Sequence, residues 1–206
     1  MNVLKATRQN IMIAANIVRN GGLVIYPTET VYGLGCDPFN AEAVKHLLEV
    51  KGKNRNKPLP VLAASLAEVK KIAFVSPKGE LLAEKYWPGS LTLVFPKKHE
   101  FPSWVTFGLD SVGLRIPDNV VALSLICLSG GLLVGSSANK TGEPSPRSVD
   151  EVSYELKELV DVVIDGGHSV QGMPSTVVDL TSDEPKVLRE GPISCRQIVD
   201  TLFSGD

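Results

Sequence analysis

Four cationic side chains lie within seven residues of this chain, at Lys51, Lys53, Arg55 and Lys57. They come directly after a helix-like segment and before an apolar run, in a protein whose formal net charge is only −2. A weakly acidic chain that gathers cations at one point is typical of a protein that holds an anion there. Taken alone, the cluster is explained better as a solvated helix end, because cations there complement the helix dipole.

Two further segments carry hydroxyl and amide groups after short apolar runs. The first is Pro27-Thr28-Glu29-Thr30, and the second is Gly135-Ser136-Ser137-Ala138-Asn139. The hydroxyls of Thr28 and Thr30 can donate to a ligand oxygen, although turn side chains that bond their own backbone explain both segments more simply. Together with the cations, these groups suggest a pocket for a phosphorylated ligand.

Arg115 stands between apolar neighbours on a predicted strand, so the direction of its side chain matters. The side chain either reaches a solvated face or points inward, and the sequence favours neither. If it points inward it needs an anion, and its planar guanidinium suits a carboxylate or a phosphate. Arg189 is explained equally well by a surface pair with its neighbour Glu190.

Several common kinds of site are missing from the sequence. It contains no GxxxxGK[ST] loop, and Gly33 and Gly35 form only a fragment of a dinucleotide-binding fingerprint. No Ser-His-Asp pattern is visible. The three cysteines and three histidines lack the spacing of metal ligands, so we expect no metal-binding residues.

The composition indicates a globular protein. Hydrophobic residues make up 43% of the 206 residues and charged residues 21%, which fits a single domain over residues 1–206. A pI near 6.0 argues against binding to nucleic acid by overall charge alone. An odd number of widely spaced cysteines indicates reduced thiols, and neither a signal peptide nor a membrane-length apolar run is found. We therefore expect a cytoplasmic protein outside the membrane.

Hydrophobic periods and turn signals predict helices that alternate with strands. Helices are expected at residues 10–19, at 43–48 with Asn40 as N-cap, after Ser65, after Ser76, from Asp118 to about residue 128, at 148–159 and after Ser194. Strands are expected at residues 23–26, 59–63, 91–95, 112–116, 132–134, 162–165, 176–180 and 186–188. This order predicts a single α/β domain with a mixed, twisted β-sheet and flanking helices, whose strand-end loops carry the site.

Seven of these segments, taken in order, resemble the motifs of the YrdC family, the threonylcarbamoyl-AMP synthases. The segments are residues 26–35, 51–53 with 57–59, 87–92, 115–117, 137–139, 174–179 and 188–191. One such motif would be weak support, but seven in the correct order are strong support. The similarity covers most of the chain.

The resemblance implies a YrdC-like fold, a twisted α/β sheet around a large, positively charged concave surface. It also implies a nucleotidyltransferase that uses ATP with Mg²⁺, L-threonine and bicarbonate to make L-threonylcarbamoyladenylate and pyrophosphate. The product would pass to a tRNA threonylcarbamoyltransferase machinery for threonylcarbamoyladenosine modification of tRNA. Because the reaction crowds anions together, cations and small polar groups would act mainly by positioning and charge neutralisation.

Carried over motif by motif, the resemblance assigns the site residues. The threonine side would comprise Thr30, Arg115, Ser137 and Ser175. The ATP side would comprise Lys53, Lys57, Ser111, Asn139, Arg147 and Arg189. Lys51 and Lys53 would be the catalytic cations, with Lys51 near the reacting phosphate and carboxylate.

The chain departs from the family pattern at two of these positions. Lys53 stands where arginine is usual, and a point charge does not reproduce a bidentate fork. Arg55, two residues later, can compensate if the loop shifts. Arg147 stands where many members carry threonine. The chain ends soon after Gly191, so the resemblance is to the short, single-domain members.

Two other functions remain open. An RNA-binding paralogue of the same fold, without synthase activity, would bind double-stranded RNA or tRNA through phosphate contacts, and the lysine at position 53 keeps it under consideration. A carbamoyl-phosphate-using activity, as in larger hydrogenase-maturation proteins, is less favoured because the further domains of those proteins are not found in these 206 residues.

Overall fold

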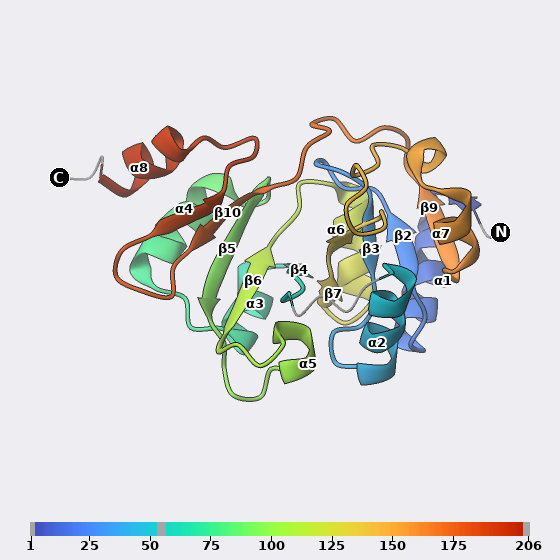
Figure 1. The fold of residues 1–206 in the computed structure, drawn as a ribbon, viewed down its shortest axis with the longest axis horizontal. Coiled ribbons are helices and arrows are strands. Elements are labelled where there is room, and N and C mark those ends of the chain that lie inside the picture. The colour runs from blue at the N-terminus through green and yellow to red at the C-terminus, as the bar shows by residue number, and fades with distance from the viewer. Residues whose placement is uncertain (1–2, 53–56, 204–206) are drawn as a thin grey trace.

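The computed structural model describes residues 3–52 and 57–203. Its strands are β1 (Val3–Lys5), β2 (Val24–Tyr26), β3 (Gly33–Gly35), β4 (Val61–Ala63), β5 (Leu91–Pro96), β6 (Ser111–Arg115), β7 (Leu132–Val134), β8 (Ser136–Ser137), β9 (Val162–Asp165), β10 (Thr176–Asp179) and β11 (Lys186–Arg189). They form a five-stranded sheet in the order β1-β9-β2-β3-β8 and a six-stranded sheet in the order β11-β10-β5-β6-β4-β7. Both sheets mix parallel and antiparallel pairs. Figure 1 shows them side by side.

Helices pack against both sheets and begin at the expected capping residues in most cases. They are α1 (Arg8–Arg19), α2 (Ala41–Val50), α3 (Leu66–Ile72), α4 (Pro77–Tyr86), α5 (Ser103–Thr106), α6 (Val120–Leu128), α7 (Tyr154–Glu158) and α8 (Cys195–Phe203). The side chains of Asn40, Ser65 and Ser76 each accept a backbone N–H at the start of α2, α3 and α4. Among the described residues, no helix is long and apolar enough to cross a bilayer.

The structure confirms the α/β class and corrects several details. The strands divide between two sheets, whereas a single sheet was expected. The sequence missed β1, β3 and β8 because they are very short or, in β3, rich in glycine. The positively charged concave surface stays a prediction.

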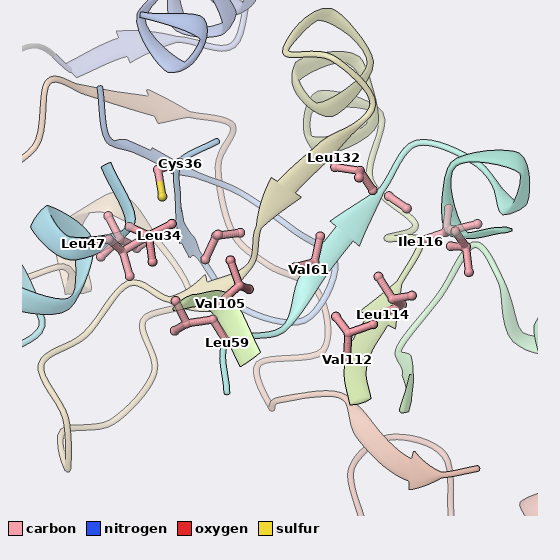
Figure 2. Close-up of a cluster of buried hydrophobic side chains, with 14 of the residues drawn as sticks. Leu34, Cys36, Leu47, Leu59, Val61, Val105, Val112, Leu114, Ile116 and Leu132 are labelled. Atoms are coloured by element: carbon pink, nitrogen blue, oxygen red, sulfur yellow. The ribbon is translucent and has the colours of Figure 1, made fainter. Parts of the chain in front are cut away.

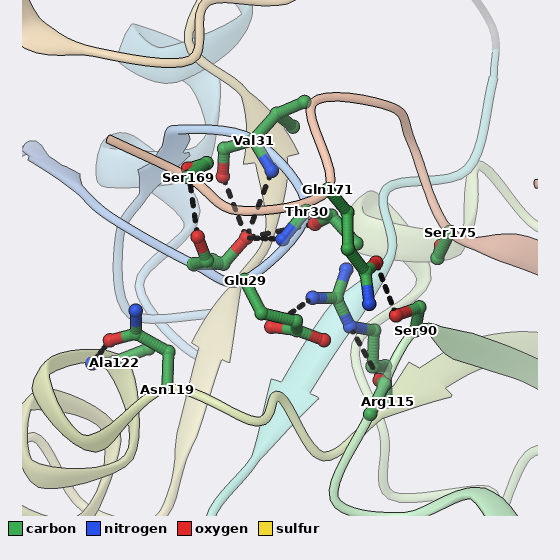
Figure 3. Close-up of polar contacts among 12 residues, drawn as sticks. Glu29, Thr30, Val31, Ser90, Arg115, Asn119, Ala122, Ser169, Gln171 and Ser175 are labelled. Carbon is green, nitrogen blue, oxygen red and sulfur yellow. Dashed lines mark hydrogen bonds and ion pairs between the residues drawn. The ribbon is translucent and has the colours of Figure 1, made fainter. Parts of the chain in front are cut away.

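Two predicted helices begin or end elsewhere. The N-cap of α6 is Asn119 instead of Asp118, and its Oδ1 accepts from the backbone N–H groups of Val121 and Ala122 (Figure 3). The predicted helix 148–159 is a 3₁₀ turn at Val149–Glu151 followed by α7. Ser153 restarts the helix because its hydroxyl accepts from the backbone of Leu156.

Two buried hydrophobic clusters hold the elements together. The larger cluster runs from α2 to the six-stranded sheet through Leu34, Leu47, Leu59 and Leu114, all at most 6% exposed (Figure 2). The smaller one packs α1 against the five-stranded sheet and α6 against α1, β4 and β7. Burial of these faces is the main favourable contribution to folding, and it also fixes the strand ends that surround the site.

The chain passes from one sheet to the other at Gly135, between β7 and β8. The Gly135 backbone N–H donates to the Pro60 carbonyl, 2.8 Å away. A Cβ at this position would lie 2.6 Å from Cγ of Leu62, which is itself buried. Glycine is therefore required here by close packing.

We expect Gly135→Ala to destabilise the protein by about 1–3 kcal/mol, because the added methyl group overpacks a buried contact. Denaturant unfolding, followed by circular dichroism, measures this change.

Gly113→Ala is the matched control, because it adds the same methyl group at a glycine of β6. Its Cβ would meet the Thr92 and Val94 side chains at 3.4 and 3.8 Å, which is ordinary contact distance. Equal unfolding midpoints for the two variants would contradict the packing argument.

Candidate functional site

A cavity of about 520 Å³ lies on one face of the six-stranded sheet and is bordered by segments from the other sheet. The five-stranded sheet contributes Thr30 and Val31, which follow β2, and the residues of β8. The cavity brings together six of the predicted site residues: Thr30, Ser111, Arg115, Ser137, Ser175 and Arg189. Their roles in binding stay predictions, but their proximity is a property of the fold.

Strand alternation places the floor of this cavity. Every second residue of β6 lines it, namely Ser111, Gly113 and Arg115. The strand register extends this face across the sheet. Val94 of β5 pairs with Gly113 of β6 on one side and with Asp179 of β10 on the other side. The cavity therefore has a floor of small and apolar residues with charged groups around it.

Arg115 points inward, which decides the question that the sequence left open. The residue is 6% exposed, and its Nη2 lies 2.7 Å from Oε2 of Glu29, which is 7% exposed (Figure 3). Its Nε donates to the Gly89 carbonyl at 3.0 Å. A buried guanidinium needs such an anion, since an unpaired buried charge is very costly.

A second guanidinium, that of Arg189, borders the same cavity. Its Nε donates to the Ser175 carbonyl at 3.0 Å, and its Nη2 reaches the Ser175 hydroxyl at 3.4 Å. That hydroxyl is also 2.8 Å from Oγ1 of Thr92. Desolvation, and then repulsion by Arg115, lower the pKa of Arg189. A ligand anion between the two guanidinium groups would relieve this repulsion.

Lys51 lies outside the cavity lining and bonds to the segment that forms the rim of the cavity. It is the C-cap residue of α2, and its Nζ donates to the backbone carbonyls of Ser137 at 2.5 Å and Asn139 at 2.9 Å. Burial lowers the pKa of this amine to about 8. Lys51 thus ties the end of α2 to the segment that carries Ser137.

Several known proteins are similar to this chain in sequence and fold. Residues 16–191 match the model of the Sua5/YciO/YrdC family, described as telomere recombination. The chain is 42% identical to threonylcarbamoyl-AMP synthase of Pyrococcus abyssi, across 91% of the chain and 56% of that protein. It is 35% identical to threonylcarbamoyl-AMP synthase of Cellvibrio japonicus, across 83% of the chain and 91% of that protein. The crystal structure of P. abyssi Sua5 complexed with L-threonine matches with a TM-score of 0.94 and 38% identity, across 98% of this chain and 61% of that one.

This chain belongs to the Sua5/YciO/YrdC family. It spans about half the length of the curated relatives from P. abyssi and Bacillus subtilis. The family resemblance predicted from the motifs is confirmed.

Four of the predicted family residues lie outside the described cavity lining. Lys51 bonds to its rim, and Lys57 is exposed next to Pro58, which lines it. The Asn139 side chain donates to the carbonyls of Lys140 and Glu143, so it orders its own loop.

Arg147 and Lys53 are the two remaining cations of the family motifs. Arg147 is exposed, and its side chain lies against Gly172, where a Cβ would come within 2.5 Å of its Nε. Lys53, together with its proposed compensating residue Arg55, lies outside the described residues.

The sequence missed several residues of this site. Glu29 lies in the first of the two hydroxyl-bearing segments, but its pairing with Arg115 requires the two sheets to be assembled. Thr92 and Asp179 line the cavity as well. Alternation along β5 and β10 could have indicated them, because they share a face with Val94 and Val177.

We expect the stability of the wild type, relative to Lys51→Met, to rise between pH 8 and about pH 10.5. In this window the unfolded chain binds a proton at Lys51 that the folded chain binds only weakly, since burial lowers the pKa from 10.5 to about 8. Urea unfolding of both proteins across the window measures the difference.

Lys45→Met is the matched control, because Lys45 is an exposed lysine of the same helix. Its difference from the wild type should show no comparable rise. A pH-independent difference for Lys51→Met would contradict the burial of its amine.

Proposed function

We propose that this protein is an L-threonylcarbamoyladenylate synthase, a nucleotidyltransferase that converts ATP, L-threonine and bicarbonate into threonylcarbamoyl-AMP and pyrophosphate. The observation that supports the proposal most directly is that one cavity brings together Thr30, Ser111, Arg115, Ser137, Ser175 and Arg189. A structural relative has been crystallised with L-threonine, which supports an amino-acid site in this fold.

The charges of the cavity suit this chemistry. In the proposed reaction the free amine of threonine bonds to the carbon of bicarbonate and water is lost, and an oxygen of the resulting carbamate attacks the α-phosphate while pyrophosphate leaves. Arg115 would hold the threonine carboxylate, and Arg189 would face the nucleotide phosphates. Both groups are held by backbone carbonyls, so little reorganisation is needed when charge shifts during the reaction.

Mg²⁺ would neutralise part of the triphosphate charge and favour departure of pyrophosphate. Asp179 is the carboxylate among the described residues that line the cavity, and no cluster of three His, Cys, Asp or Glu side chains occurs in the described parts of the chain. Such an ion would therefore be held mainly by the phosphates of the nucleotide. Lys53 and Lys57 remain predicted ATP-binding residues.

The product would serve threonylcarbamoyladenosine formation in tRNA, through a separate threonylcarbamoyltransferase machinery. The thiols of Cys36, Cys127 and Cys195 are all free, which fits a reducing compartment, and we place the activity in the cytoplasm.

Purified protein, incubated with ATP, Mg²⁺, bicarbonate and L-threonine, should release pyrophosphate only when threonine is present. The Arg115→Lys variant keeps the charge opposite Glu29 but loses the planar fork. We expect it to raise the KM for threonine about tenfold or more, with a smaller change in the KM for ATP.

Omission of threonine is the control for background ATP hydrolysis. If folded wild-type protein releases no pyrophosphate, the synthase proposal is wrong. Salt-sensitive binding of double-stranded RNA without ATP or threonine would then support the RNA-binding paralogue.

A further inference from the structure

Helix α6 has the composition of an interior helix, because none of its nine residues is charged. Its inner side packs into the smaller hydrophobic cluster through Ala122, Leu125 and Ile126, which are fully buried. A helix that is apolar on all sides is typical of a protein interior, since a surface helix normally presents polar side chains to water. The outer side of α6 is nevertheless open to solvent, with Val120 77% exposed and Leu128 39% exposed. This outer side is therefore a candidate contact surface.

A groove of about 650 Å³ lies between the start of α1 and the outer side of α6. The two helices pack against each other, and Nη1 of Arg19, the last residue of α1, donates to the Leu128 carbonyl at 3.1 Å. This α1–α6 groove is lined mainly by apolar side chains, among them Ile11, Val120, Val121, Leu123, Cys127 and Leu128. It shares no described residue with the cavity of the candidate site.

The same face carries both a hollow and a projection. Val120 stands at the edge of the α1–α6 groove and remains largely exposed. A two-fold symmetric contact uses one surface patch twice, so such a patch must be complementary to itself. A second copy of this chain could place its Val120 in the groove and receive the first copy's Val120 in its own.

The charges of this face are complementary to themselves in the same way. Arg8 begins α1 and lines the groove, and Asp118 lies two residues before Val120. Because the last residues of α1 and α6 are bonded to each other, the two helices run in the same direction and their first residues lie at the same end. Arg8 and Asp118 are both exposed, and neither has a salt bridge to any residue that the structure describes.

A membrane surface matches the groove less well than a second copy does. Helices that lie on membranes are rich in lysine and arginine on their polar side, which attracts anionic lipids. Here Arg8 is the charged side chain among the described residues that line the groove, and the net charge of the whole chain is −2. The occupant should therefore be an apolar surface with a carboxylate opposite Arg8, and this chain carries both at the same face.

We propose that two copies of this chain form a two-fold symmetric dimer through the α1–α6 groove. Each copy places Val120 in the groove of the other and Asp118 opposite Arg8 of the other, so every contact forms twice. The dimer is independent of the proposed synthase function, because the groove and the cavity share no described residue.

Sedimentation velocity of the intact chain at about 1–300 µM tests the dimer, since this range covers typical weak self-association. Reducing agent prevents disulfide links through the exposed thiols of Cys127 and Cys195. The mass of the wild type should approach twice the 22.1 kDa of the chain as the concentration rises. Val120→Asp should weaken the dimer about tenfold or more, because each copy then buries an unpaired charge in the other.

The substitution at Val120 carries little risk to the fold. The side chain is exposed, and a carboxylate in the first turn of a helix is favourable to the helix dipole. Val170→Asp is the matched control, because Val170 is 85% exposed and lies outside the groove. It should dimerise as the wild type does. Thermal unfolding checks that both variants are folded.

Charge reversal tests the pairing of Arg8 with Asp118 across the dimer. Arg8→Glu places two carboxylates opposite each other, and Asp118→Lys places two cations opposite each other. Each variant alone should therefore dimerise about fivefold or more weakly at low salt. In an equal mixture, the opposing charges match at both positions of a mixed dimer, so the mixture should dimerise about as strongly as the wild type. Pairing within one copy could not produce this rescue, because each copy still carries its own mismatch.

The proposal is wrong if the folded wild type stays monomeric over the whole concentration range, which would leave the groove to a different partner. It is also wrong if Val120→Asp dimerises as strongly as Val170→Asp, since the contact would then lie elsewhere. A mixture of Arg8→Glu and Asp118→Lys that dimerises no better than either variant alone would overturn the proposed arrangement. Loss in the single variants, with recovery in the mixture, supports it. Pyrophosphate release by a monomeric wild type would leave the synthase function standing without the dimer.

Discussion

The buried pair of Glu29 and Arg115 is the interaction on which the rest of the site depends. Arg115 ends β6 of the six-stranded sheet, whereas Glu29 follows β2 of the five-stranded sheet, so their 2.7 Å contact joins the two sheets. Removing one partner of such a pair typically costs about 3–5 kcal/mol, because the other charge stays buried and unpaired. The pair therefore constrains how the sheets meet, and that meeting creates the cavity.

Other polar contacts support the same arrangement. The segment that connects β9 to β10 crosses between the sheets and is held by the backbone of the Thr28–Thr30 region. Gln171 and Gly172 donate their N–H groups to the carbonyls of Glu29 and Thr30, and the Gln171 side chain accepts from Ser90 (Figure 3). These bonds fix the segment next to the ion pair, whose two side chains are only 7% and 8% exposed to solvent.

The cations of the family motifs have different surroundings in the structure, although the resemblance assigned them to one site. Lys51 is partly buried and bonds to backbone carbonyls, so it shapes the rim of the cavity before any ligand arrives. Arg189 borders the cavity next to another guanidinium, which suits it to an anionic ligand. Arg147 lies on the surface against Gly172. Similar charge does not imply similar function, because burial and neighbours decide what each cation can do.

The sequence by itself determined the α/β class, most helix starts and the family. These depend on local patterns, such as the capping hydroxyls of Ser65 and Ser76 and the order of the seven motifs. It did not determine the division into two sheets, because strands as short as β8 carry almost no periodic signal and form only by pairing. It also left the direction of Arg115 open. That direction was decided by a partner brought close in space, since a buried charge takes the anion that the fold supplies.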